Sequence, residues 1–377
     1  MADKKQEQAN PVNNEELLSL RDQIDAIDEQ LQNLISDRAA CAQRVAEVKQ
    51  MARESGQDEP PLFYRPEREA QVLQRVMARH SGPLNQEDMA RLFREIMSAC
   101  LALENTLQVA YLGPEGTFTQ QAAIKHFGQW VKTKPLIAID EVFRDVEAGA
   151  VNYGVVPVEN STEGVVNHTL DTFLNSNLKI CGEVELRIHQ HLMIGPNTRQ
   201  EAISRIYSHQ QSLAQCRKWL DAHMPHVERV PVSSNAEAAK RVFTEWNAAA
   251  IAGGMAAEMY DLEIISPKIE DHPENSTRFL IIGRESVPRS GQDKTSIIVS
   301  MRNGPGTLFE LLKPFSEQGI DMTRLETRPA PSGNWAYVFF IDFKGHLDDE
   351  NVQTALQQVE AKAVEVKLLG SYPMAVL

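Results

Sequence analysis

Residues 15–54 contain neither proline nor glycine, and this uninterrupted segment constrains the fold of the N-terminal region more than any other feature. Its apolar residues recur at intervals of three and four, the spacing of one helix face: Leu17, Leu20, Ile24, Ile27, Leu31, Leu34, Ile35, Ala42 and Val45. The pattern predicts a single helix of roughly 39 residues, about 58 Å long. Because a small domain needs no helix of this length, we expect it to pack against a partner helix, as from a second subunit.

Four cations interrupt or border this apolar stripe. At 100° per residue, Arg38 and Lys49 fall in its middle, and Arg21 and Arg53 at its edge. Burying a cation without a counter-charge is costly, so a partner is expected for each. Two interpretations are open: ion pairs or side chains that extend to water, or a pocket for a dicarboxylate. Further helices are predicted at residues 64–79 and 86–106, with a loop at 57–62.

This region resembles the all-helical chorismate mutase domain of bifunctional P-proteins, which couple chorismate mutase to prephenate dehydratase. The resemblance rests on Arg38, Lys49 and the motifs LLSLRDQIDAID, PERE and FREIMSACLALE. It implies a site built between two intertwined subunits, with Arg21 and Arg38 on substrate carboxylates. It also places Lys49 on a carboxylate and the ether oxygen, and Glu69 on the substrate hydroxyl, supported by Arg68.

Two positions depart from the pattern of well-known relatives, because Cys100 and Glu104 stand where those have Ser and Gln. Arg65, where some relatives have Asp, is assigned no role. A Claisen rearrangement needs no proton transfer, only a held conformation and stabilised charge. Glutamine donates a hydrogen bond at any pH, whereas Glu104 donates only when protonated. We therefore expect mutase activity to fall as pH rises, unless burial keeps Glu104 neutral.

Strand and helix patterns alternate through residues 108–288, which predicts an α/β region with largely parallel sheets. Expected strands lie at residues 109–113, 153–158, 179–186, 191–194, 206–207, 227–232, 248–252 and 278–283, and a helix at 120–127. Residues 108–288 contain more strands than one sheet usually holds. We expect two lobes, with crossings near 186–190 and 262–270 and a cleft where polar strand-end loops converge.

Four polar segments are candidates for this cleft: residues 113–119, 159–164, 208–215 and 275–279. The second follows a β-branched run and precedes helical spacing through Val165, Leu170 and Leu174. It is therefore expected at a helix N-terminus, where N–H groups and the helix dipole favour an anion. The alternative is that Asn160 or Ser161 only caps that helix.

Together the motifs YLGPEGTFT, VVPVENSTEG, YSHQQSLAQC and NSTRF are similar to those of prephenate dehydratases along the whole region. The resemblance implies that Thr277 acts at the leaving hydroxyl, by a hydrogen bond or a proton relay, and that Asn160, Ser208 and Gln215 are needed for activity. It also implies substrate-binding roles for Thr117, Ser161, Thr162 and Arg278. The resemblance gives His209 no role; a general acid and a structural residue are both open interpretations.

After a linker at residues 288–293, the chain predicts the order βαββαβ, the split βαβ pattern. The strands are expected at 294–302, 320–327, 335–343 and from 364, and the helices at 307–318 and 348–359. This order is the arrangement of ACT regulatory domains. Two segments resemble the phenylalanine-binding motifs of P-proteins: Gly306, Thr307 and Leu308, and Glu326, Thr327, Arg328 and Pro329. Gly306 has no Cβ atom, so its backbone could approach a ligand closely. A dimerisation domain without effector is the alternative.

Composition excludes several other classes. The net charge of −14 disfavours nucleic acid, and an acidic chain is expected to hold an anionic metabolite only through clustered Arg and Lys. No apolar run is long enough for a membrane, and the polar N-terminus predicts no signal peptide. The four cysteines are isolated, which predicts reduced thiols in a cytoplasm and no zinc site: Cys41, Cys100, Cys181 and Cys216. Neither GxGxxG nor GxxxxGK[ST] occurs, which disfavours a dehydrogenase.

We expect three domains: an all-α chorismate mutase domain at residues 1–107, with a disordered arm at 1–14; a bilobal, periplasmic-binding-protein-like α/β dehydratase domain at 108–288; and an α+β ferredoxin-like ACT domain at 293–377. The resemblance implies a cytoplasmic homodimer or higher homo-oligomer that converts chorismate through prephenate to phenylpyruvate, is inhibited by L-phenylalanine, and needs no cofactor or metal. The rival is a non-catalytic amino-acid sensor, which would need neither Arg38, Lys49 nor Thr277 at those places.

Overall fold

The computed structural model describes residues 14–54, 64–329 and 337–376. The arm predicted at residues 1–14, apart from Asn14, and the loop predicted at 57–62 fall outside these ranges. The chain divides into two compact units, residues 1–63 with 103–105 and residues 64–102 with 106–377, which are described separately.

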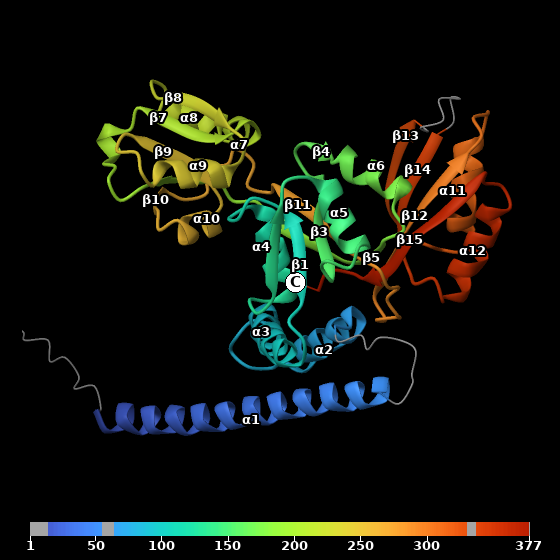
Figure 1. Ribbon diagram of the computed structural model, residues 1–377, viewed down its shortest axis with the longest axis horizontal. Helices are drawn as coiled ribbons and strands as arrows, with labels where there is room; N and C mark the ends of the chain where they lie inside the picture. The colour runs from blue at the N-terminus through green and yellow to red at the C-terminus, as the bar shows by residue number, and fades with distance from the viewer. Residues whose placement is uncertain (1–13, 55–63, 330–336, 377) are drawn as a thin grey trace, which may run out of the picture. The chain divides into compact units, whose positions relative to one another are not determined.

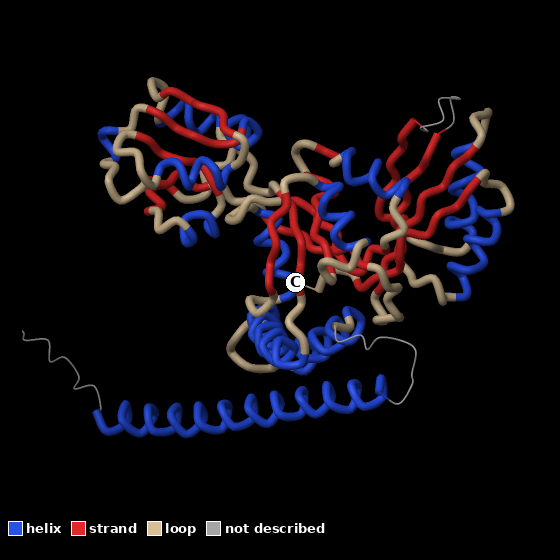
Figure 2. Tube along the Cα trace, in the orientation of Figure 1, coloured by secondary structure: helices blue, strands red, loops and turns tan. Residues whose placement is uncertain are grey.

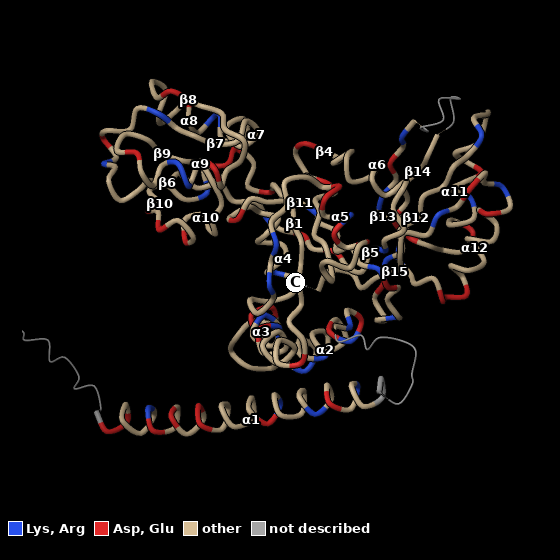
Figure 3. The backbone as a smooth tube through the Cα atoms, in the orientation of Figure 1, with Lys and Arg blue, Asp and Glu red and all other residues tan. Residues whose placement is uncertain are grey.

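The first unit is dominated by α1 (Asn14–Glu54), a single helix of 41 residues (Figure 1), which confirms the predicted long helix. Acidic and basic residues both occur along its length (Figure 3). Its large apolar side chains are 41–64% exposed in the described chain: Leu17, Leu18, Leu20, Ile24, Ile27, Leu31, Leu34, Ile35, Val45, Val48 and Met51. None of the helices in the described ranges combines the length and the apolar character that crossing a membrane requires.

The second unit begins with α2 (Pro66–Arg79) and most of α3 (Gln86–Glu104). The inner face of α2 buries Ala70, Leu73 and Val76. Just before the helix, the Tyr64 ring lies 5.2 Å from that of Phe127 and 5.4 Å from that of Tyr153, measured between ring centroids. This N-terminal segment thus shares a hydrophobic core with the sheet that follows it.

Two sheets form the lobes of the central region (Figure 2). The first has the order β2-β1-β3-β11-β5, with β4 paired to β3, and the second has the order β10-β6-β9-β7-β8. The first comprises β1 (Gln108–Leu112), β2 (Lys132–Leu136), β3 (Tyr153–Asn160), β4 (Gly164–Val165), β5 (Lys179–Arg187) and β11 (Ser276–Gly283). The second comprises β6 (His191–Ile194), β7 (Arg205–His209), β8 (Glu228–Val232), β9 (Ala248–Ala252) and β10 (Glu263–Ser266).

Helices follow most of these strands. In the first lobe they are α4 (Phe118–Phe127), α5 (Ile139–Glu147) and α6 (Asn167–Asn175). In the second lobe they are the short 3₁₀ turn Gln200–Ala202, α7 (Gln210–Gln215), α8 (Arg217–His223), α9 (Asn235–Val242) and α10 (Gly254–Met259). The predicted strands are present, whereas β2, β4 and β10 were not predicted from the sequence.

The expectation of largely parallel sheets is wrong. β1 pairs in parallel with β2 and β3, and β7 with β8 and β9, but the other pairings are antiparallel. The reason is the path of the chain. It leaves the first lobe after β5 at residues 188–190, near the predicted crossing, and returns at 267–275. The returning β11 inserts between β3 and β5 and runs antiparallel to both.

The polar segment at residues 159–164 is not at a helix N-terminus. It forms the end of β3 and the turn into β4, which pairs back onto β3 through Glu159–Val165 and Asn160–Gly164. Helix α6 starts only at Asn167, and its N-cap Val166 offers no side-chain cap. Neither the predicted anion site nor the alternative of simple capping by Asn160 or Ser161 is therefore correct.

The C-terminal region has the predicted βαββαβ order and a four-stranded antiparallel sheet, β13-β14-β12-β15. Its elements are β12 (Asp293–Met301), α11 (Thr307–Glu317), β13 (Met322–Pro329), β14 (Tyr337–Lys344), α12 (Glu350–Glu360) and β15 (Glu365–Pro373). One sheet face packs on α11 and α12, with Ile297 and Val299 among its residues. The other face, with Ile298, packs on the core of the first lobe.

Candidate functional site

A cavity of about 280 Å³ lies where strand ends of the two lobes meet. From the first lobe it is lined by Thr117, Asn160 and Thr277, and from the second by His209 and Gln215. All five lie in the polar segments that were expected at the cleft, and the structure brings them together. The convergence follows from topology: β1, β3 and β7 end at the cavity, and the antiparallel β11 begins there, so Thr277 lies beside Asn160.

Asn160 and Thr277 form the centre of this cavity. They are register partners on the neighbouring strands β3 and β11. The Asn160 Nδ2 group donates to Thr277 Oγ1 at 2.8 Å and to Asn275 Oδ1 at 3.1 Å. Asn160 Oδ1 in turn accepts from the backbone N–H of Thr162 at 3.0 Å and from its hydroxyl at 2.7 Å. Because Thr277 Oγ1 already accepts one hydrogen bond, its own proton can be donated to a ligand.

Hydrogen bonds also join the two lobes across the cavity. Asn275 Nδ2 donates to Gln215 Oε1 at 3.2 Å. Gln215 Nε2 lies 3.5 Å from Thr162 Oγ1 and 3.3 Å from Glu163 Oε1, while Gln211 Nε2 donates to Glu163 Oε2 at 2.6 Å. Thr162 and Gln215 therefore belong to a polar bridge between the β3–β4 turn and α7. Ser161 braces this turn, since its Oγ accepts from the N–H of Ser276 at 3.0 Å.

Ser208 lies beneath the cavity and is completely buried. Its hydroxyl is within 2.7 Å of the Ile251 carbonyl and 3.0 Å of Asn235 Oδ1, which also accepts from the N–H of His209 at 3.1 Å. Ser208 therefore holds Asn235 at the cavity wall. Sequence reasoning missed Asn235. It ends the polar run Ser233-Ser234-Asn235, which follows β8 as the other polar segments follow or begin their strands.

No Lys or Arg is among the described residues that line this cavity, so the expected concentration of cations is absent there. The wall instead includes the first residues of α4, with the N-cap Thr117, and of α9, with the N-cap Ser234. Backbone N–H groups and the positive end of the helix dipole can hold carboxylates at such positions. His209 is the one titratable side chain among the described lining residues. Its Nδ1 accepts from Gln211 N–H at 3.4 Å, which favours its structural interpretation as a cap of α7.

Arg278 does not point into the cavity. Successive residues of a strand face opposite sides of a sheet, so the side chain that follows Thr277 lies on the far face. There Arg278 Nη1 donates to Asp342 at 2.6 Å, and its Nε donates to Glu183 at 2.8 Å. The structure therefore contradicts the expectation that Arg278 binds substrate.

In the first unit, Lys49 Nζ lies 3.9 Å from Glu104 Oε2. The Glu104 side chain is only 11% exposed, and no described residue donates a hydrogen bond to its Oε2. Burial raises the pKa of Glu104, and the charges of Lys49 and Arg38 offset part of that rise. Arg38 is half-buried and Arg21 exposed. Lys49 and Glu104 are thus brought together, and the charge of Arg38 acts on Glu104.

The remaining residues predicted on the helices belong to the second unit. Glu69 is largely buried and accepts from Arg94 Nε at 3.1 Å. Burial raises the pKa of Glu69, opposed by the charge and hydrogen bond of Arg94. Cys100 is buried and Arg68 exposed. Arg94 was not singled out from the sequence, and a basic side chain on the third helix carried no signal that it would pair with Glu69.

The two C-terminal motif segments lie on separate elements. Gly306 has φ +80° and is the N-cap of α11, whose first residues are Thr307 and the 43% exposed Leu308. The Thr307 hydroxyl closes the preceding turn on the carbonyl of Gly304, at 2.9 Å. The second segment, Glu326 to Pro329, forms the end of β13, where Arg328 pairs with Asp171 of α6 at 2.7 Å. In the described ranges, no group of three His, Cys, Asp or Glu residues could hold a metal ion.

Three family models match the chain: chorismate mutase type II at residues 20–105, prephenate dehydratase at 109–287 and the ACT domain at 295–361. A bifunctional chorismate mutase/prephenate dehydratase of Pseudomonas aeruginosa is 65% identical over 363 residues, which cover 96% of this chain and 99% of that protein. One of Aquifex aeolicus is 41% identical and covers 96% of this chain and 99% of that protein. The solved structure of prephenate dehydratase in complex with L-Phe from Arthrobacter aurescens has a TM-score of 0.66 at 33% identity, over 71% of this chain and 90% of that chain.

Proposed function

The chain belongs to the family of bifunctional chorismate mutase/prephenate dehydratases, and from this we propose that it rearranges chorismate to prephenate, converts prephenate to phenylpyruvate, and is inhibited by L-phenylalanine. We assign the mutase to residues 1–107, the dehydratase to 108–288 and the regulatory domain to 293–377. The observation that carries the proposal is the Asn160–Thr277 pair at the centre of the cavity.

The dehydratase step removes the ring hydroxyl and one carboxylate of prephenate together. The electron pair of the breaking C–CO₂ bond moves into the ring as the C–O bond breaks, and the ring becomes aromatic. The departing hydroxide needs a hydrogen-bond donor. The Thr277 hydroxyl supplies it, because Asn160 occupies an acceptor position of the same oxygen and orients it. Gln215 and Thr117 line the same wall, and the helix N-termini hold carboxylates.

The mutase step moves electrons within one molecule, so its site acts by orientation and charge. Lys49 can hold a carboxylate and the ether oxygen, and Arg38 a second carboxylate. Glu104 lies against Lys49 and carries a buried oxygen without a donor among the described residues, which fits a group that faces a ligand. Protonated Glu104 would donate to the ether oxygen as negative charge develops there.

We expect the mutase kcat/KM to fall as pH rises. Burial raises the pKa of Glu104, so its carboxyl stays protonated to a higher pH than an ordinary glutamic acid and then loses its proton. The protonated form donates a hydrogen bond and the ionised form cannot. The profile from pH 4.5 to 9 is measured for wild type and Glu104→Gln, which donates throughout. A flat wild-type profile that Glu104→Gln leaves unchanged would contradict the role of Glu104.

The length of α1 supports a homodimer. Lys49 lies 28 residues after Arg21 on one continuous helix, a separation of about 42 Å. Both cannot reach one small substrate from the same helix, so we assign Arg21 to the site of a second copy. The exposed apolar stripe of α1 offers that copy a surface.

The C-terminal domain is the proposed site of L-phenylalanine. A prephenate dehydratase of the same fold has been solved in complex with L-Phe. Gly306, Thr307 and Leu308 and the segment Glu326 to Pro329 are the groups that we assign to it. Coupling between sites is reciprocal, so prephenate should weaken L-phenylalanine binding by the factor by which L-phenylalanine weakens prephenate binding.

We also propose a cytoplasmic location. Cys41, Cys100, Cys181 and Cys216 are all free, as is usual for proteins of a reducing compartment. Burial raises the pKa of the Cys181 thiol to about 12, which keeps it protonated and unreactive.

The first experiment incubates the purified chain with chorismate alone and follows the products by NMR, with and without L-phenylalanine. We expect phenylpyruvate without added cofactor, and less of it with L-phenylalanine. Prephenate that accumulates in the wild type would overturn the dehydratase assignment and keep the mutase. Unchanged chorismate would favour the sensor.

A further inference from the structure

The strands β3 and β11 have two functional faces. Asn160 and Thr277 are register partners that border the cavity, and the preceding and following residues, Glu159 and Arg278, are register partners as well. Because side chains alternate along a strand, this second pair lies on the opposite face. On that face it meets the C-terminal ACT domain. One layer of backbone therefore separates the catalytic pair from the ACT sheet.

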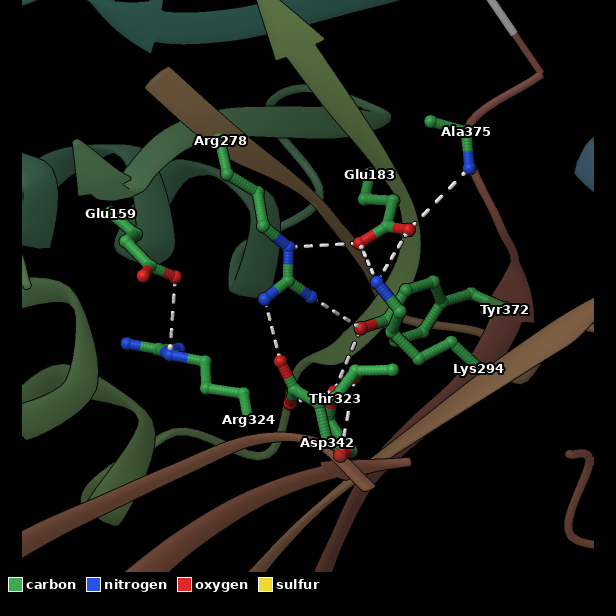
Figure 4. A network of polar contacts seen from close by, with 10 residues as sticks. Glu159, Glu183, Arg278, Lys294, Thr323, Arg324, Asp342, Tyr372 and Ala375 are labelled. Atoms are coloured by element: carbon green, nitrogen blue, oxygen red, sulfur yellow. Dashed lines mark hydrogen bonds and ion pairs between the residues drawn. The ribbon is translucent and has the colours of Figure 1, made fainter. Parts of the chain in front are cut away.

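Arg278 is held by three acceptors (Figure 4). Its Nε donates to Glu183 Oε2 at 2.8 Å, its Nη1 to Asp342 Oδ2 at 2.6 Å and its Nη2 to the Tyr372 hydroxyl at 3.0 Å. The Arg278 side chain is 16% exposed, and those of Glu183 and Asp342 are 7% and 8% exposed. A planar guanidinium with three fixed partners has little freedom to turn toward a ligand.

The partners are themselves braced by the ACT domain. Asp342 lies on β14 and accepts from Ser296 of β12 at 2.6 Å, and Lys294 of β12 donates to both oxygens of Glu183 at 2.8 Å. Two carboxylates and two cations balance within this buried group. Such a network is stable only when complete, because removal of one member leaves a buried charge unpaired.

A second contact reaches the other strand. Arg324 of β13 lies 3.4 Å from Glu159 by Nε to Oε2, and its side chain is 8% exposed. Arg324 Nε and Nη2 make no hydrogen bond within the described residues. The Arg324–Glu159 contact is therefore looser than the contacts of Arg278. Glu159 is adjacent in sequence to Asn160, as Arg278 is to Thr277.

We propose that Arg278 is a positioning residue of the dehydratase site, and that the ACT domain, through Asp342 and Tyr372, holds it so that Thr277 stays in register with Asn160. The proposal rests on the proposed dehydratase function. Adjacent Cα atoms are 3.8 Å apart, so a shift of the Arg278 backbone moves Thr277 almost equally. A displacement of about 1 Å at a reacting group can cost roughly 100-fold in rate.

The test compares three variants of the full chain. Asp342→Asn removes the charge that holds Arg278. Arg278→Lys keeps the cation, but its donors sit on one nitrogen and cannot span the three acceptors that the guanidinium reaches with three nitrogens. Both are expected to lower the dehydratase kcat by about 10-fold or more, with KM for prephenate changed by less than about 3-fold. Asp171→Asn is the matched control. It breaks another ion pair between the ACT domain and the first lobe, with Arg328, but Asp171 lies on α6 and not on β3 or β11. Its kcat should stay within about 2-fold of wild type.

Chorismate mutase activity on the same chain and the thermal unfolding midpoint report whether each variant is folded. If Asp342→Asn does not fold, Arg278→Lys alone tests the proposal, because lysine keeps a positive charge beside Glu183 and Asp342. A KM raised 10-fold or more by Arg278→Lys with kcat retained would show that Arg278 binds substrate and would overturn the proposal. Wild-type kcat in both folded variants would overturn it too. Failure of the wild type itself to form phenylpyruvate would instead reject the proposed function.

Discussion

Thr277→Val is expected to lower the dehydratase kcat roughly 10³-fold, the cost typical of removing one donor aimed at developing charge. Valine nearly matches threonine in shape but lacks the hydroxyl, so the leaving hydroxide loses its donor and Asn160 Nδ2 loses its 2.8 Å acceptor. Formation of phenylpyruvate from prephenate measures the effect. Chorismate mutase activity of the same preparation should remain at the wild-type level, and prephenate should accumulate from chorismate.

Thr277→Ser is the matched control for that experiment. It keeps the hydroxyl and loses only a methyl group, so its kcat should stay within about 10-fold of wild type. A valine variant that retains much of the activity while the serine variant retains little would show that Thr277 contributes shape and not a hydrogen bond.

Lys49→Met and Arg21→Ala should each lower the mutase kcat/KM by roughly 10³-fold, because each removes a charge that holds or stabilises the rearranging substrate. Dehydratase activity on added prephenate should be unchanged. In a dimer, the two substitutions on one chain would affect different active sites. Since about 42 Å along α1 separates the two residues, the proposed dimer has Lys49 of one chain and Arg21 of the other in the same site.

Co-expression of these two variants tests that assignment. In a mixed dimer one site carries both substitutions and the other carries neither. Random pairing makes half of the dimers mixed, so about a quarter of wild-type mutase activity should return. Activity that stays at the level of the single variants would show that Arg21 and Lys49 do not belong to one shared site, and would remove the main support for the intertwined dimer.

The sequence alone predicted the elements whose signals are local. The absence of proline and glycine between residues 15 and 54 was enough for α1, and the spacing of the last six elements predicted the βαββαβ order. The polar strand-end segments predicted a shared cavity, because the carboxyl ends of strands in an α/β fold converge. Within these segments Thr117, Asn160, Gln215 and Thr277 were assigned by the resemblance to prephenate dehydratases, and all four line the cavity.

Tertiary structure decided what lies against each of these elements. Strand alternation shows that Thr277 and Arg278 face opposite sides but not which side holds the cavity; that depended on β11 returning from the second lobe between β3 and β5. The ACT sheet, which is distant in sequence, covers the far side of β11, where its residues Asp342 and Tyr372 accept hydrogen bonds from Arg278. Likewise, the acidic composition indicated clustered cations for an anionic ligand, whereas the described lining of the cavity contains no Lys or Arg and includes the first residues of α4 and α9. Local pattern fixes an element and its faces, and only the packing of distant segments determines what each face meets.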